Sequence, residues 1–392
     1  MPNQMYTGAT GDEFKRLFES LQIKKVKFRN RIVLPAIVTN YATPDGFVTQ
    51  GLISFHEARA KYTGLNIVEL SLVRPYGGVA VNHVHVYDDK YIPGLTKLAQ
   101  AIKVNGAVGL LQLADIGPRA GSLGAIADPV GPSRITIGPQ AARELSIAEI
   151  KDLVIAFAEA ARRAFEAGFD GVEIHAAHLY LISAFLSLFT NKRTDEYGGC
   201  VENRARFLLE IIKATKERVP DDFLLSCRID MFEPFEGGIE MRDVIAIAQL
   251  LEKAGIDVLS LSGICQKMTT KRDGKEFDWF TTACPQNWPE GHEIKCAVQV
   301  KREVKIPTIV VGKIFSPQLA ENILELKQAD LIAMARALIS DPDLPRKVLE
   351  NRDRDIVRCR EEFRCLRTLG EGKPIACAVN KSLPPEKIHI PA

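Results

Sequence analysis

Eight short apolar runs, separated by amphipathic segments, constrain the fold of this 392-residue chain more than any other feature. The runs are rich in β-branched residues and do not alternate between apolar and polar positions, which is typical of parallel strands buried on both faces. They cover residues 31–36, 65–73, 107–113, 170–175, 222–228, 256–262, 306–312 and 329–335. Eight strands that alternate with helices predict an α/β fold, the (β/α)8 TIM barrel. A doubly wound open sheet is the competitor, but no Gly-x-Gly-x-x-Gly follows the first run.

The amphipathic segments have the signals of helices. Three of them cover residues 146–168, 201–219 and 240–255. The first starts with Ser146 and Glu149, the Ser-x-x-Glu pattern of a capping box, and ends at Gly168, a common helix terminator.

The composition narrows the class of protein. Lys and Arg total 51 against 49 for Asp and Glu, so the chain lacks the positive excess that would favour nucleic acid. No run approaches the length of about 18 apolar residues that a membrane span requires. Residues 1–14 include acidic side chains and no apolar stretch, so we expect no secretory signal and a cytoplasmic location.

The cysteines are expected to be thiols or ligands, because disulfides are rare in a reducing compartment. They lie at positions 200, 227, 265, 284, 296, 359, 365 and 377. Cys227 stands in an apolar run and is expected in the core. Only the last three are grouped in sequence.

The barrel is expected to occupy residues 1–352 as one domain, followed by a short C-terminal extension, 353–392, that packs on it. Residues 114–145 are rich in Gly and Pro and predict a long loop after the third strand. In a barrel this loop lies on the face that carries active sites.

His175, His178 and Tyr180 form the most distinctive polar group. His175 is predicted to end the fourth strand, at the mouth of the barrel. The pair of histidines could bind a metal with a third ligand from elsewhere, or satisfy backbone groups near a strand end. A third interpretation is a pair of N–H donors for an anion or a carbonyl oxygen, with Tyr180 as general acid. The residues alone favour the third interpretation without excluding the others.

Other strand ends carry polar groups that suit a bound heterocycle and a phosphate. Gln112 ends the third run and Arg228 ends the fifth. Residues 310–314 and 334–342 follow the seventh and eighth strands, where this fold usually binds phosphate, and Arg336 would add charge-assisted hydrogen bonds.

Several segments resemble the Old Yellow Enzyme family of FMN-dependent ene-reductases. The longest runs from His175 to Gly199 and contains the His-x-x-His-x-Tyr pattern and Asn-Lys-Arg-Thr-Asp-Glu-Tyr-Gly-Gly. The others are residues 28–36, 86–107, 110–113, 201–211, 237–263 and 329–348. The resemblance extends over nearly the whole chain.

The resemblance implies roles for individual residues. His175 and His178 match the pair that hydrogen-bonds the substrate carbonyl oxygen, and Tyr180 matches the proton donor to the α-carbon. The positions that match flavin contacts are Pro35, Ala36 and Ile37 along the ring, Leu70 beside it, Gln112 and Arg228 at its polar edge, and Gly312, Lys313, Ala335 and Arg336 at the phosphate.

The chain departs from the family in its tail. The sequence around Met334 and the tail resemble the branch with 2,4-dienoyl-CoA reductase and trimethylamine dehydrogenase, which carries a [4Fe-4S] cluster on four cysteines and further domains. Here Cys359, Cys365 and Cys377 remain, but Glu362 stands where the second cysteine would fall. We expect a lost cluster, no other metal site and, since the sequence stops at 392, no further domains. A cluster with a carboxylate ligand or an open fourth iron is the alternative.

Two further departures concern the flavin pocket. Leu70 stands where relatives mostly have Gly or Ala, and Ala114 and Asp115 replace the common Trp-His pair. The substrate or the electron donor is therefore expected to be unusual.

The resemblance implies FMN as cofactor, NAD(P)H as electron donor, a small-molecule substrate and a homo-oligomer. The leading hypothesis is an ene-reductase that acts on an α,β-unsaturated carbonyl compound or an enoyl thioester. The alternatives are a flavin-dependent dehydrogenase that oxidises an amine or another C–H substrate, and a degenerate barrel that binds a ligand without turnover. An RNA-modifying FMN barrel is disfavoured by the near-neutral charge.

Overall fold

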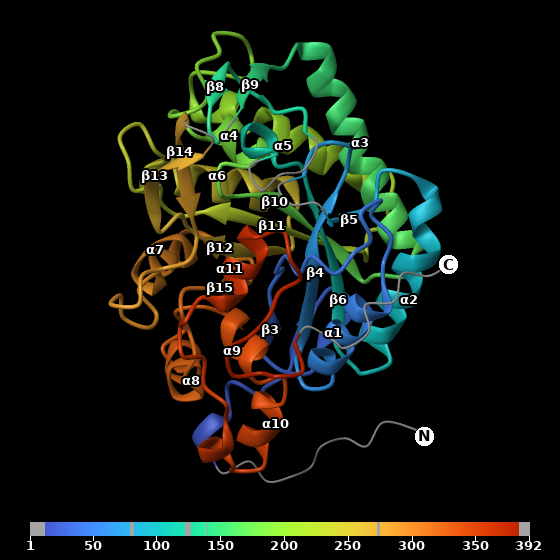
Figure 1. Ribbon diagram of the computed structural model, residues 1–392, viewed down its shortest axis with the longest axis vertical. Helices are drawn as coiled ribbons and strands as arrows, with labels where there is room; N and C mark the ends of the chain where they lie inside the picture. Colours follow the sequence, from blue (N-terminus) through green and yellow to red (C-terminus); the bar gives the residue numbers. More distant parts are fainter. Residues whose placement is uncertain (1–11, 79–81, 122–126, 139, 273–274, 384–392) are drawn as a thin grey trace.

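A closed barrel of eight parallel strands forms the centre of the protein (Figure 1). The computed structural model describes residues 12–78, 82–121, 127–138, 140–272 and 275–383. The strands are β3 (Ile32–Leu34), β4 (Leu65–Leu72), β6 (Val108–Ala114), β10 (Gly171–Ala176), β11 (Leu224–Asp230), β12 (Val258–Ser262), β15 (Thr308–Val310) and β16 (Leu331–Ala333). Each strand overlaps its predicted apolar run, and β3 pairs with both β4 and β16. The predicted (β/α)8 barrel is confirmed.

Helices surround the barrel. They are α1 (Gln50–Ala60), α2 (Ile92–Lys103), α3 (Ile147–Glu166), α4 (Leu181–Leu186), α5 (Val201–Lys216), α6 (Met241–Ala254), α7 (Ile294–Glu303), α8 (Pro317–Glu325), α9 (Ala335–Ser340), α10 (Leu344–Leu349) and α11 (Arg364–Gly370). The three helices expected from amphipathic patterns correspond to α3, α5 and α6. Within the described ranges, no helix combines the length and the apolar character needed to cross a bilayer.

Apolar side chains fill the interior of the barrel toward the amino ends of its strands. Leu65 and Ile67 of β4 pack there with Leu110 of β6, while Val68 belongs to the layer between strands and helices. The hairpin of β1 (Leu21–Ile23) and β2 (Val26–Phe28) joins the same interior cluster through Phe28. Burial on both faces is the physical reason why the strands are continuous apolar runs.

Two segments beyond the barrel strands carry strands of their own. The predicted loop 114–145 contains a small sheet of β7 (Val130–Gly131), β8 (Ile135–Thr136) and β9 (Ala141–Glu144). After β12, an antiparallel hairpin of β13 (Gln266–Arg272) and β14 (Lys275–Thr281) extends the connection to α7. Strands of two to four residues are too short to show a period in the sequence, so the first segment was predicted as a loop.

The tail contacts the loop that follows β3. Tyr41 donates a hydrogen bond through its hydroxyl to the carbonyl oxygen of Ile375 at 2.9 Å, and the Ile375 amide donates to Thr39 at 2.9 Å. The division of the chain into a barrel and an extension stays a prediction.

The structure joins Cys265 and Cys284 as a disulfide, so the expectation that all cysteines are thiols or ligands is wrong for this pair. The antiparallel pairing of β13 with β14 brings the two residues together although 19 positions separate them in sequence. Cys227 is fully buried in β11, as expected for a core residue.

The capping box of α3 is confirmed and supports a first prediction. The Ser146 hydroxyl accepts a hydrogen bond from the Glu149 amide, and Glu149 accepts one from the Ser146 amide. Ser146→Ala should lower the free energy of unfolding in urea by about 1 kcal/mol, because one amide at the helix start loses its partner. Ser54→Ala, an exposed position in α1, is the control and should change stability by a few tenths of that. Equal effects of the two substitutions would contradict the prediction.

Candidate functional site

A cavity of about 730 Å³ opens at the carboxyl ends of the barrel strands. This volume lies in the range of small-molecule and cofactor sites. Every residue predicted for catalysis or flavin binding lines it: Pro35, Ala36, Ile37, Leu70, Gln112, His175, His178, Tyr180, Arg228, Gly312, Lys313, Ala335 and Arg336. Their roles stay predictions, but the structure brings all of them to one place.

The two histidines and Tyr180 form a compact aromatic group. The ring centroids of His175 and Tyr180 lie 4.6 Å apart, and those of the two histidines lie 4.9 Å apart. His175 lies within β10, whereas His178 and Leu179 adopt left-handed backbone conformations with φ of 66° and 53°. Two consecutive positive φ values turn the chain sharply, so that His178 faces the same cavity as His175.

Hydrogen bonds orient both imidazole rings. The amide of Ala177 donates to Nδ1 of His175 at 3.2 Å, so the neutral His175 ring carries its proton on Nε2. Nε2 of His178 lies 2.9 Å from the hydroxyl oxygen of Ser262, and the His178 amide donates to the carboxylate of Asp230.

Burial keeps the histidines neutral. It holds the pKa of both imidazoles well below the usual value, and the positive charge of Arg228 lowers the pKa of each further. Each neutral imidazole offers one N–H donor, which suits the oxygen atom of a carbonyl group. A site for an anion would be better served by charged imidazolium rings.

Polar groups at the ends of β6 and β11 form another side of the cavity. Gln112 donates through Nε2 to the Glu173 carboxylate at 2.7 Å, which fixes the orientation of its amide. Arg228 donates through Nη2 to the Ser262 hydroxyl at 3.1 Å. Its buried Nε has no hydrogen-bond partner among the described residues, so this donor is available to a carbonyl or ring nitrogen of a bound heterocycle.

Two cations mark an anion site after β15 and β16. Lys313 and Arg336 each form an ion pair with the carboxylate of Glu361 at 3.1 Å. Gly312 has φ of 134°, which permits the tight turn before Lys313. The two ion pairs with Glu361 show that Lys313 and Arg336 together can hold a carboxylate. The donor set and the cavity therefore fit FMN; that Lys313 and Arg336 hold its phosphate and Arg228 its polar ring edge stays a prediction.

Other residues of the site were missed by sequence reasoning. Arg119 lies in the loop after β6, donates to the carbonyl oxygens of His178 and Phe280 at 2.7 Å each, and stands 5.3 Å from the centre of the Tyr180 ring. Residues 280–284 and helix α11 also line the cavity. They lie in the connections that follow β6 and β12, the β13–β14 hairpin included, or in the tail, where no periodic pattern or barrel strand end indicated them.

The departures near the flavin pocket have structural explanations. Leu70 is buried and packs with Ala114 and Ile116, so its side chain occupies space beside the cavity. Asp115 forms an ion pair with Arg74 and accepts a hydrogen bond from a backbone amide. Asp115 therefore organises the loop.

The three cysteines of the tail lie near one another without converging. Burial raises the pKa of Cys359 and Cys365, and the proximity of Cys377 raises the pKa of each further. Within the described residues their sulfur atoms do not form a group of converging ligands. Cys365 lines the cavity from α11.

Known proteins resemble this chain over most of its length. Residues 16–355 match the model of the NADH:flavin oxidoreductase / NADH oxidase family. An NADH oxidase from Thermoanaerobacter brockii is 38% identical over 354 residues, which are 88% of this chain and 52% of that protein. An NADPH dehydrogenase from Halalkalibacterium halodurans is 37% identical over 85% of this chain and 93% of its own length. The chain thus spans about half the length of the NADH oxidase.

A solved structure shows the same architecture. The complex of 2-naphthoyl-CoA reductase with 2-naphthoyl-CoA superposes with a TM-score of 0.86 at 29% sequence identity. The match covers 95% of this chain and 58% of that one.

The ion pairs of Glu361 predict that this residue competes with a phosphate. Glu361→Gln should tighten FMN binding about fivefold, because an ion pair worth about 1 kcal/mol no longer opposes the incoming phosphate. Binding is measured by quenching of flavin fluorescence. Riboflavin, which lacks the phosphate, should bind equally to both proteins.

Glu362→Gln is the matched control, since Glu362 is exposed and adjacent. It should leave FMN affinity unchanged. If Glu361→Gln tightened riboflavin binding as much as FMN binding, Glu361 would not compete with the phosphate.

Proposed function

Because the chain belongs to the NADH:flavin oxidoreductase / NADH oxidase family, we propose that it reduces the carbon–carbon double bond of an α,β-unsaturated carbonyl compound. FMN is its cofactor, and NADH or NADPH supplies the electrons. The observation that carries this proposal is the group of His175, His178 and Tyr180 in the cavity that also holds the anion site. Reduced FMN supplies the hydride when it is bound.

The two histidines act on the carbonyl oxygen of the substrate. Addition of hydride at the β-carbon places negative charge on that oxygen, and N–H donors aimed at it stabilise the charge. His175 offers Nε2–H, because its Nδ1 accepts a backbone hydrogen bond. Both rings are neutral and held by protein contacts, so they need little reorganisation during the reaction.

Tyr180 supplies the proton for the α-carbon. Its ring belongs to the same aromatic group as the imidazoles. The centroid of the Tyr180 ring lies 4.6 Å from that of His175 and 5.9 Å from that of His178. A phenol positioned in this way can act as a general acid.

Positive charge in the cavity disfavours the amine-oxidising alternative. Arg119 and Arg228 both line the cavity, and the neighbouring histidines are neutral. An ammonium substrate would be repelled there, whereas an enone, or a thioester with an anionic tail, would be accepted. We therefore favour a neutral or anionic carbonyl substrate, which includes enoyl thioesters. A homo-oligomeric state stays a prediction.

A direct assay tests the proposal. The purified protein reconstituted with FMN should be yellow, lose its visible absorbance when NADH or NADPH is added without oxygen, and regain it with an enone such as cyclohexenone. Failure of the enone to reoxidise the reduced protein, together with flavin reduction by an amine, would refute the ene-reductase proposal.

The role of Tyr180 has its own test. Tyr180→Phe should keep flavin reduction by the nicotinamide but slow reoxidation by the enone about 10²- to 10⁴-fold, the usual contribution of a general acid. Stopped-flow absorbance separates the two half-reactions. Tyr76→Phe, an exposed tyrosine, should leave both rates unchanged. An unchanged rate of enone reduction in Tyr180→Phe would exclude Tyr180 as the proton donor.

A further inference from the structure

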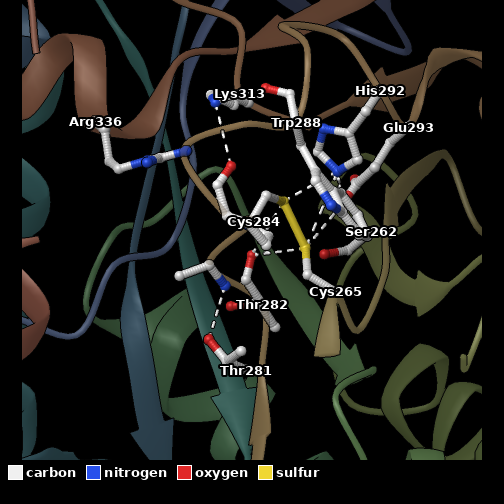
Figure 2. Close-up of a disulfide and its surroundings, with 12 residues drawn as sticks. Ser262, Cys265, Thr281, Thr282, Cys284, Trp288, His292, Glu293, Lys313 and Arg336 are labelled. Atoms are coloured by element: carbon white, nitrogen blue, oxygen red, sulfur yellow. Dashed lines mark hydrogen bonds and ion pairs between the residues drawn. A yellow bond between two sulfur atoms is a disulfide. The ribbon is translucent and has the colours of Figure 1, made fainter. Parts of the chain in front are cut away.

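Four potential metal ligands meet at the rim of the cavity. Cys265 follows β12, Cys284 follows β14, and His292 and Glu293 precede α7. Figure 2 shows the imidazole of His292 and the carboxylate of Glu293 directed toward the two sulfur atoms. Cys284 and Glu293 also line the cavity of the candidate active site. The group thus lies beside the catalytic residues but includes none of them.

The distances within this group suit one small cation. One ligand atom from each of the four residues lies within 4.8 Å of all the others. Nε2 of His292 is 3.0 Å from Sγ of Cys284 and 3.4 Å from Oε1 of Glu293, and Sγ of Cys265 is 4.0 Å from both Nε2 and Oε1. Ligands of a tetrahedral zinc ion lie roughly 3.3–3.8 Å apart, given metal–ligand bonds of about 2.0–2.3 Å.

The chemistry of the four residues also points to a cation. Two cysteines, an imidazole and a carboxylate are the donors that zinc prefers, and all four side chains are at least nine-tenths buried. Oε2 of Glu293 and Nδ1 of His292 are buried without a hydrogen-bond partner among the described residues. A buried carboxylate whose hydrogen bonds are incomplete is costly unless a positive charge lies next to it.

We propose that Cys265, Cys284, His292 and Glu293, with both cysteines reduced, bind one Zn²⁺ ion. Four protein ligands fill a tetrahedral shell and leave no position for water or substrate, so the ion is structural. It ties the β13–β14 hairpin to the start of α7 at the rim of the cavity.

The disulfide and the metal site exclude each other, because a cysteine binds zinc only as a thiolate and not as part of a disulfide. Reaction of the disulfide with a trialkylphosphine and one water yields two thiols and the phosphine oxide. Zinc then displaces the two thiol protons into solvent. The structure shows the disulfide form of the pair.

The zinc site would also support the proposed phosphate site. Residues 285–291 lie in sequence between the ligands Cys284 and His292, and their carbonyl oxygens hold Lys313. Nζ of Lys313 donates to the carbonyl oxygens of Gln286 and Trp288 at 2.7 and 2.6 Å. The amide of Gly291 donates to the carbonyl oxygen of Gly312 at 2.9 Å. Ordering of this segment by zinc should therefore order Lys313, a consequence that rests on the proposed function.

Metal analysis tests the site without any assay of turnover. The full-length protein is reduced with a phosphine, freed of metal, incubated with Zn²⁺ and dialysed without oxygen. Elemental analysis should then find one equivalent of zinc in the wild type and in Cys200→Ser, a control at an exposed cysteine. Cys265→Ser and Cys284→Ser should each lose most of it, because each lacks one thiolate.

Cobalt provides a second measurement that needs no variant. Co²⁺ added to the reduced wild-type protein should give intense d–d absorption at wavelengths beyond the flavin bands, which is diagnostic of tetrahedral thiolate ligation. Weak octahedral absorption, or zinc retained equally by Cys284→Ser, would overturn the site.

Removal of zinc should weaken binding of FMN several-fold and leave binding of riboflavin unaffected. Equal FMN affinity with and without zinc would overturn the coupling to Lys313 but not the metal site.

Discussion

Closure of the parallel sheet is the interaction on which the rest of the structure depends. Val33 of β3 lies in register with Leu65 of β4 on one side and with Ala333 of β16 on the other. The eight described strands therefore have no free edge, and their carboxyl ends share one rim. This shared rim is why Gln112 and Arg336, which are far apart in sequence, line the same cavity.

Burial at this rim controls the chemistry. Desolvation and the positive charge of Arg228 keep His175 and His178 neutral, so they serve as hydrogen-bond donors. Arg119 and Arg228 both line this cavity and supply positive charge to it. The cavity thus combines neutral imidazole donors with the positive charge of two arginines.

The anion site depends on three segments that are distant in sequence. The turn after β15 provides Lys313, the carbonyl oxygens of residues 285–291 hold its ammonium group, and Glu361 of the tail balances its charge. Each contact crosses from one connection to another at the rim.

Local signals in the sequence predicted the barrel and singled out the group of His175, His178 and Tyr180. Apolar runs buried on both faces and capping residues such as Ser146 are local signals, and the pattern from His175 to Tyr180 lies within seven positions of one strand end. The tertiary structure alone decided which residues meet across the rim. It paired Glu361 with Lys313, placed Arg119 beside Tyr180, and brought Cys265 and Cys284 to His292 and Glu293. Those partners come from separate loops, and loop contacts leave no period in the sequence because they depend on how the barrel closes beneath them.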